Sequence, residues 1–162
     1  MTYVGPVTPT DDAMFCAIRS IVLAWERLRQ YQSAIRNVGV SELIALGHLF
    51  HDGELTPGEL SSRLGLSSGT MTALVDRLED GGYAARTPNP DDRRSQLIHI
   101  SETGRATMDS IYAEFKRSIH STLAGLPAHT RRAIVDSLVA VAADVDAYAT
   151  TLAITSDHSA AE

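Results

Sequence analysis

Residues 56–82 contain two short helix patterns joined by one glycine-containing turn, and this feature restricts the fold most. The TPGE at 56–59 has the form of a capping box with proline at the first helical position, which predicts a helix over 57–64. Gly65 follows at once, where the chain must turn in a left-handed conformation. The helix is therefore barely two turns long and stops sharply.

A second helix follows this turn directly. Either Ser67 or Ser68 caps it, and its inward face is formed at i, i+3, i+4 and i+7 by Met71, Leu74, Val75 and Leu78. Gly81-Gly82 ends it. A short helix, a glycine turn and a second helix together predict a helix-turn-helix.

The next segment predicts a β-hairpin attached to this motif. Residues 83–86 and 97–100 are short strand candidates, and the turn-rich stretch 88–95 joins them. Such a hairpin beside a helix-turn-helix is called a wing. Its tip contains DDRRS, two arginines next to two aspartates.

Long helices are predicted on both sides of this winged module. One amphipathic pattern covers 11–36, and a shorter helix capped by Ser41 leads into the motif, ending near 51–53. Another long helix begins at 101–104, and a final one follows the break at Leu126-Pro127. We expect a mostly α fold with a small β-hairpin wing, in which 37–102 form the winged helix-turn-helix and 1–36 with 103–162 form a helical dimerisation region. A homodimer would cover the apolar stripes of these long helices.

Composition narrows the class of protein. The formal net charge of −6 argues against a general nucleic-acid binder, and residues 56–100 hold five arginines against six carboxylates, so binding must depend on where the arginines point. No apolar run could span a membrane, and the N-terminus has no signal-peptide pattern, so we expect a cytoplasmic protein.

A single cysteine and scattered histidines predict no metal site. No catalytic constellation or phosphate-binding loop is present, which predicts neither an enzyme nor a cofactor.

Three segments in order resemble the MarR family of bacterial transcriptional regulators, the multiple-antibiotic-resistance type. They are LTPGELSSRLGLSSGTMTALVDRLEDGGYAAR, the DDRRS of the wing and the ISETG that opens the next helix. The resemblance implies a dimeric winged-helix protein that binds a palindromic operator in double-stranded DNA, most often as a repressor. It also implies release by a small molecule or by oxidation.

The second helix of a helix-turn-helix enters the major groove with its N-terminal outward residues. Here the expected DNA contacts on that helix are Ser68, Gly69, Thr70 and Thr72. Two roles stay open for Arg77, further along the helix: it reaches a phosphate, or it pairs with Glu79 or Asp80 on the surface.

The wing supplies the remaining expected DNA contacts. A wing tip can place arginine in a narrow minor groove, where negative potential is concentrated. The Asp-x-Arg pair of the resembled family implies Asp92 as the brace and Arg94 as the minor-groove residue, with Arg93 beside the backbone. The resemblance also implies that Arg86 supports the wing by pairing with a wing aspartate.

A ligand pocket is expected between the long helices and the module, for a small aromatic or phenolic molecule. Its candidate lining residues are Trp25, His48, His51, Tyr112 and Phe115. Two alternatives stay open. One is a redox-sensing regulator through Cys16, although the sequence favours a buried, inert cysteine. The other is a winged-helix module that binds a protein partner and no DNA.

Overall fold

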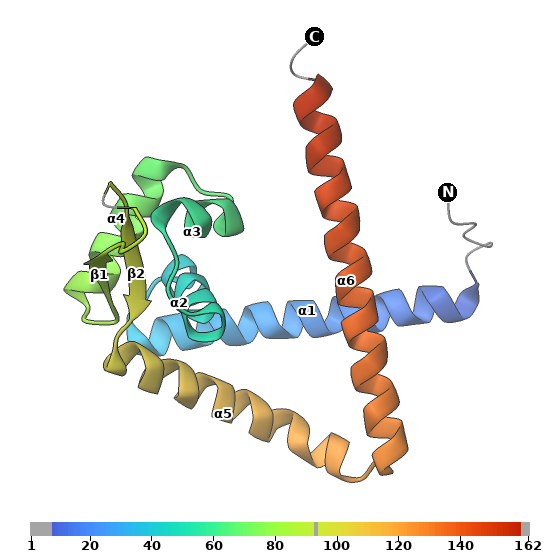
Figure 1. Ribbon diagram of the computed structural model, residues 1–162. Coiled ribbons are helices and arrows are strands. Elements are labelled where there is room, and N and C mark those ends of the chain that lie inside the picture. The colour runs from blue at the N-terminus through green and yellow to red at the C-terminus, as the bar shows by residue number, and fades with distance from the viewer. Residues whose placement is uncertain (1–7, 93, 160–162) are drawn as a thin grey trace. The chain divides into compact units, whose positions relative to one another are not determined.

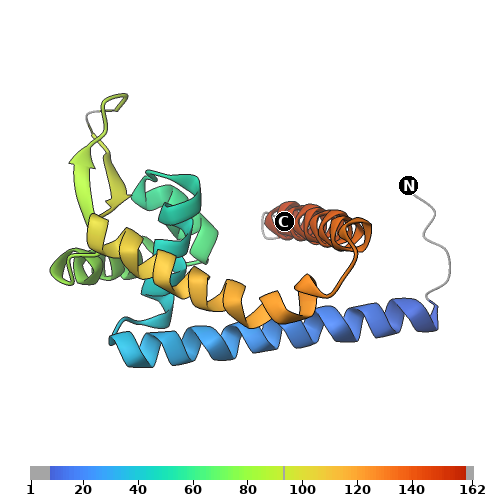
Figure 2. The same ribbon diagram turned by 90° about the horizontal axis from the view of Figure 1, so that it is seen from below.

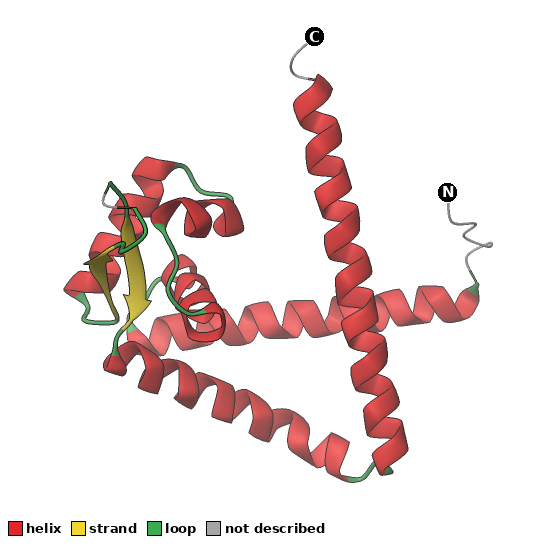
Figure 3. Cartoon of the chain, in the orientation of Figure 1, coloured by secondary structure: helices red, strands yellow, loops and turns green. Residues whose placement is uncertain are grey.

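The computed structural model describes residues 8–92 and 94–159, with side chains as far as residue 152. These residues form six α-helices and one two-stranded hairpin (Figures 1 and 3). The order is α1 (Pro9–Arg36), α2 (Val40–Asp52), α3 (Pro57–Leu64), α4 (Ser68–Asp80), β1 (Ala84–Pro88), β2 (Gln96–Ile100), α5 (Glu102–Ala124) and α6 (Ala128–Ser159). The mostly α winged helix-turn-helix predicted from the sequence is confirmed. The chain divides into two compact units, one ending at Ala113 and the other beginning at Glu114.

The capping box that opens α3 forms as predicted. The Thr56 backbone N–H donates to Glu59 Oε2 at 2.7 Å, and the Glu59 N–H donates back to Thr56 Oγ1 at 3.2 Å. Gly65 ends the helix in the left-handed region, with φ of 64°. The same Thr-Pro-x-acid pattern occurs at Thr8, where it forms a second box with Asp11. For this reason α1 begins at Pro9 and not at the predicted residue 11.

The expected start of α2 was wrong. Gly39 is the N-cap, and Ser41 lies inside the helix without capping it. The cause is the carboxylate of Glu42, which folds back so closely over Gly39 that a Cβ there would lie 1.9 Å from Glu42 Oε2. Only glycine leaves space for that carboxylate.

The wing is an antiparallel pair that extends slightly beyond the predicted strands. Ala84 pairs with Ile100 at its base, and Pro88 pairs with Gln96 at its outer end. Leu55 adds a short bridge to Ile98, with N–H···O distances of 3.1 and 2.8 Å, so the segment before α3 is tied to the hairpin. Figure 2 shows the hairpin standing out from the module on the side away from α1.

The buried core lies entirely within the first unit. α2, α3, α4, the hairpin and the first part of α5 contribute to it, and its fully buried large side chains include Leu46, Leu49, Leu60, Met71, Leu74, Leu78 and Ile98. All four predicted inward residues of α4 are buried. The core therefore fixes α3, α4 and the wing to one another, which is what a DNA-reading surface requires.

Candidate nucleic-acid interface

The N-terminal turns of α4 present a small, exposed and polar surface. Ser67 caps the helix, because its hydroxyl accepts the Thr70 N–H. The exposed residues that follow are Ser68, Gly69, Thr70, Thr72 and Ala73. This surface is flat enough to approach base edges in a major groove, and the first N–H groups of the helix point outward from its end.

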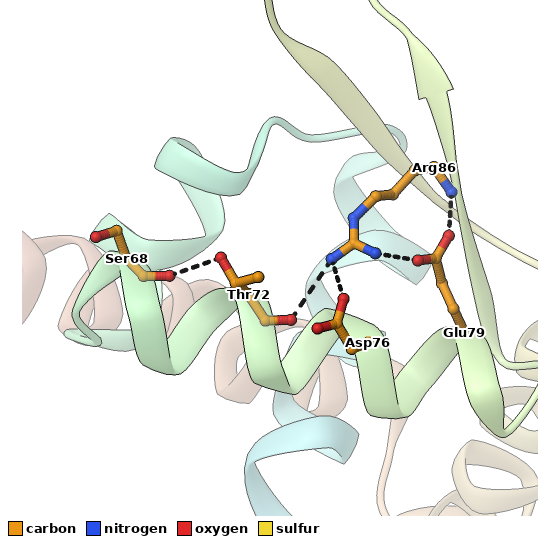
Figure 4. A network of polar contacts seen from close by, with 5 residues as sticks. All are labelled: Ser68, Thr72, Asp76, Glu79 and Arg86. Atoms are coloured by element: carbon orange, nitrogen blue, oxygen red, sulfur yellow. Dashed lines mark hydrogen bonds and ion pairs between the residues drawn. The ribbon is translucent and has the colours of Figure 1, made fainter.

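Two of these hydroxyl groups are already hydrogen-bonded within the helix. Thr72 Oγ1 donates to the Ser68 carbonyl at 3.0 Å (Figure 4), and Thr70 Oγ1 lies 2.9 Å from Ser67 Oγ. These bonds fix the side-chain rotamers before any ligand arrives. The Thr72 hydroxyl, having donated its hydrogen, offers lone pairs to amino groups on base edges.

Arg77 has a partner that the sequence did not suggest. Its Nε lies 2.5 Å from Oε1 of Glu42, which is on α2 and only 10% exposed. The surface pairing with Glu79 or Asp80 is therefore wrong. A buried carboxylate is strongly destabilising without a partner, so this pair ties α4 to α2. No local spacing signals it, because the two residues are 35 positions apart.

Arg86 also has partners other than those expected. It pairs with Asp76, at 2.7 Å from Nη2 to Oδ1, and with Glu79 through Nη1, both on α4 (Figure 4). Its backbone N–H donates to Glu79 at 2.8 Å, and Nη2 lies 3.5 Å from the Thr72 carbonyl. The expected pairing with a wing aspartate is wrong. The sequence did not predict Asp76 and Glu79 as the partners of Arg86, because the turn that ends α4 separates them from it along the chain.

The tip of the wing is organised by its own side chains. Asp92 Oδ1 accepts the Arg94 backbone N–H at 3.0 Å, and Asn89 holds Ser95 through a side-chain hydrogen bond of 2.9 Å. Asp92 therefore fixes the backbone of the tip, and among the described residues it forms no ion pair with a guanidinium group. Arg94 is exposed, and within the described part of the chain its guanidinium group has no ion pair. Arg93 lies outside the described residues.

A cavity of about 430 Å³ lies in the first unit, between α1, α2 and α5. It brings together four of the five residues expected to line a pocket, Trp25, His48, His51 and Tyr112. Phe115, the fifth, belongs to the second unit and does not line it. The volume falls in the range of small-molecule sites.

The chemistry of this cavity is aromatic with fixed positive charge. The Trp25 and Tyr112 rings are parallel within 7°, with centroids 6.4 Å apart, and Arg29 lies 5.8 Å from the Trp25 centroid. Burial raises the pKa of the Tyr112 phenol above its ordinary value, so this group stays neutral at physiological pH. Arg63 also lines the cavity, where it pairs with Asp52. Such walls suit a planar aromatic molecule that carries a negative charge.

Cys16 is exposed on α1, so the expectation of a buried cysteine is wrong for the single chain. Its backbone carbonyl accepts the Ser20 hydroxyl, as is ordinary in a helix. In the part of the chain that the structure describes, no three metal-ligating side chains converge, and no helix is long and apolar enough to cross a bilayer.

The fold and this surface define a winged helix-turn-helix protein. Comparison with known proteins agrees, because a model of the MarR family matches residues 37–95. YcgE of Bacillus subtilis, an uncharacterised HTH-type transcriptional regulator, is 44% identical over 70 residues, which cover 42% of this chain and 46% of YcgE. The match thus spans about half the length of that relative.

Solved structures extend the likeness beyond the module. Transcriptional regulator Tm0710 of Thermotoga maritima has a TM-score of 0.66 at 25% identity, over 83% of this chain and 95% of that one. A MarR family protein of Bacillus stearothermophilus has a TM-score of 0.72 at 22% identity, over 85% and 96%. Residues 37–95, which contain most of the winged helix-turn-helix, thus match the MarR family of transcriptional regulators, and the resemblance read from the sequence is confirmed.

Proposed function

We propose that this protein is a homodimeric transcriptional regulator that binds a palindromic operator in double-stranded DNA. The observation that carries the proposal is the pairing of two exposed features on one rigid core. These are the hydroxyl-rich start of α4 and the exposed Arg94 at the wing tip. The first suits a major groove and the second suits the adjacent minor groove or its phosphates.

The dimer is supported by apolar surface that the single chain leaves in water. On α6 the residues Ile134, Leu138, Val141, Val145, Tyr148 and Leu152 recur at alternating steps of four and three, the spacing of a helix-helix seam. Val145 and Tyr148 are 64% and 67% exposed. α1 adds exposed Met14, Phe15, Ile21, Val22, Tyr31 and Ile35. We assign dimerisation to the helical regions 1–36 and 103–162, because apolar helix faces of this length need a partner.

A two-fold dimer presents its recognition helices to half-sites about 34 Å apart, one turn of DNA. We propose that the protein acts as a repressor that occupies this operator, and that a small aromatic or phenolic ligand releases it. The support is the cavity in the first unit, whose walls on α1, α2 and α5 adjoin the core that carries α4. A ligand that favours one arrangement of these helices would change the distance between the two recognition helices of the dimer.

The first test is selection of preferred sequences from random double-stranded DNA, followed by binding measurements over a salt series. We expect a palindrome, and we expect Arg94→Ala to weaken its binding at least about tenfold and to flatten the salt dependence. Arg131→Ala, which removes an exposed arginine from α6, is the matched control and should bind like wild type. A protein-docking role would be supported if nothing is enriched and if the Arg94 variant is indistinguishable from wild type.

The ligand is tested through Trp25, the only tryptophan in the chain. Small aromatic carboxylates and phenols that enter the cavity should quench its fluorescence and lower the affinity for the selected operator together. Compounds that dissociate the DNA complex without changing Trp25 emission would place the ligand elsewhere.

A further inference from the structure

We infer that Arg86 is a positioning residue, which holds the wing at a fixed angle on the recognition helix through Asp76 and Glu79. This inference rests on the proposed DNA binding, because the angle matters only where wing and helix meet one duplex. The resemblance implied support of the wing through a wing aspartate, whereas the structure gives Arg86 two carboxylates on the recognition helix as partners. We call Arg86 with these two carboxylates the wing clamp.

The wing clamp leaves Arg86 little capacity for a phosphate. Its side chain is 21% exposed, Nη1 is occupied by Glu79, and Nη2 is occupied by Asp76 and the Thr72 carbonyl (Figure 4). A phosphate that approached this guanidinium group would compete with two carboxylates that are already in place. Arg94 is the contrast, since it is exposed and has no ion pair among the described residues.

The geometry of the wing clamp fixes both position and direction. Glu79 accepts the backbone N–H of Arg86 as well as its guanidinium group, so this point of β1 cannot slide along α4. Asp76 lies nearly one helical turn earlier and holds the far end of the same side chain. Two points of attachment fix the angle between the wing and α4, whereas the wing could rotate about a single one. A two-stranded hairpin is marginally stable alone, so its direction depends on such attachments.

Charge alone makes the opposite prediction about these carboxylates. Residues 56–100 hold six carboxylates and five arginines, and Asp76 is on the exposed side of α4. If electrostatic repulsion from DNA were their main effect, neutralising either one would strengthen binding. If they position the wing, neutralising either one weakens binding. The sign of the change therefore separates the two roles.

The experiment compares Glu79→Gln and Asp76→Asn with Asp80→Asn on the selected operator. Asp80 is an exposed carboxylate on the same helix with no partner among the described residues, so its variant removes the same charge and leaves the wing clamp intact. We expect a loss of about tenfold for Glu79→Gln and about threefold for Asp76→Asn, since each dimer carries two clamps. Asp80→Asn should bind at least as tightly as wild type.

A thermodynamic cycle tests whether Arg86 acts through its partners. In the wild-type protein Arg86→Met should weaken operator binding. In the double variant Glu79→Gln, Asp76→Asn, the same substitution should weaken binding further by less than about twofold. The slope of affinity against salt should be unchanged throughout. A slope that falls by about 0.9 for each Arg86 removed would identify a phosphate contact and overturn the inference. Tighter binding by both neutralised variants would overturn it too.

Hydrogen exchange on the protein without DNA tests the contact itself. In Glu79→Ala, which leaves no side-chain acceptor for the Arg86 N–H, the Arg86 amide should exchange at least about tenfold faster, while α2 amides keep their wild-type rates, which excludes general unfolding. Unchanged exchange at Arg86 would overturn the inference. This readout does not depend on an operator. If the wild-type protein selects no DNA, the proposed function is wrong, and Arg86 then has no role in DNA binding. The hydrogen-exchange result would still show whether the contact between Glu79 and Arg86 exists.

Discussion

The two units of this chain bury their apolar residues in opposite ways. The first unit encloses a continuous core in which Leu46, Leu49 and Leu60 are fully buried. In the second, none of residues 114–152 is buried, although α6 carries a regular apolar seam. The comparison teaches that the winged module has the contacts to hold its shape within one chain. In the proposed homodimer, a partner chain would cover the apolar seam of α6.

The largest expected effect is in the core of the module. Leu74→Ala removes a fully buried side chain from α4 and should lower the free energy of unfolding by about 3 kcal/mol, through lost burial and the cavity left behind. Urea denaturation followed by circular dichroism measures it. Thr72→Ala, an exposed position on the same helix, should stay within about 0.5 kcal/mol. Similar losses for both variants would mean that α4 is not anchored by this core.

The next effect is on assembly. Val145→Arg places a charge in the middle of the apolar seam and should raise the dimer dissociation constant at least about a hundredfold, because the charge would be buried without a partner. Sedimentation equilibrium measures the change. Ala140→Arg, at an exposed position on another face of α6, should leave the dimer intact. Equal behaviour of the two variants would place the dimer contact away from this seam.

The smallest effect concerns the capping box of α3. Thr56→Ala removes the hydroxyl that accepts the Glu59 N–H and should lower Tm by about 3 °C. The backbone N–H and then the hydroxyl of Thr56 lower the pKa of Glu59 below its ordinary value. A lowered pKa in the folded state stabilises the fold above the pKa of the unfolded chain, and this stabilisation disappears as pH falls through the folded value. The difference in Tm should therefore narrow in acid, and a difference constant with pH would contradict the assignment.

The sequence predicts best where the interacting residues are close neighbours. The Thr56 box, the left-handed Gly65 and the buried face of α4 all follow from residues within one or two helical turns of each other. The true start of α1 could have been predicted in the same way, because Thr8 and Asp11 form the same local capping box as Thr56 and Glu59. Four of the five residues expected to line a pocket do line one cavity, because they lie on helix faces that meet there.

Partner choice among charged residues was decided by the tertiary structure. Arg77 had acidic neighbours on its own helix, yet it pairs with Glu42, because that carboxylate is buried and needs a cation. Arg86 had aspartates nearby in the wing, yet the turn after α4 brings it back against Asp76 and Glu79.

The amino-acid sequence by itself thus determined the helices and the wing, since capping and periodicity are encoded within a few residues, and three of its segments carry the resemblance to the MarR family. Only the tertiary structure decided which arginines are engaged within the protein and which one, Arg94, is exposed at the wing tip without an ion pair among the described residues. The physical reason is that an ion pair depends on distance and burial in three dimensions, and both are set by packing between elements far apart in the chain.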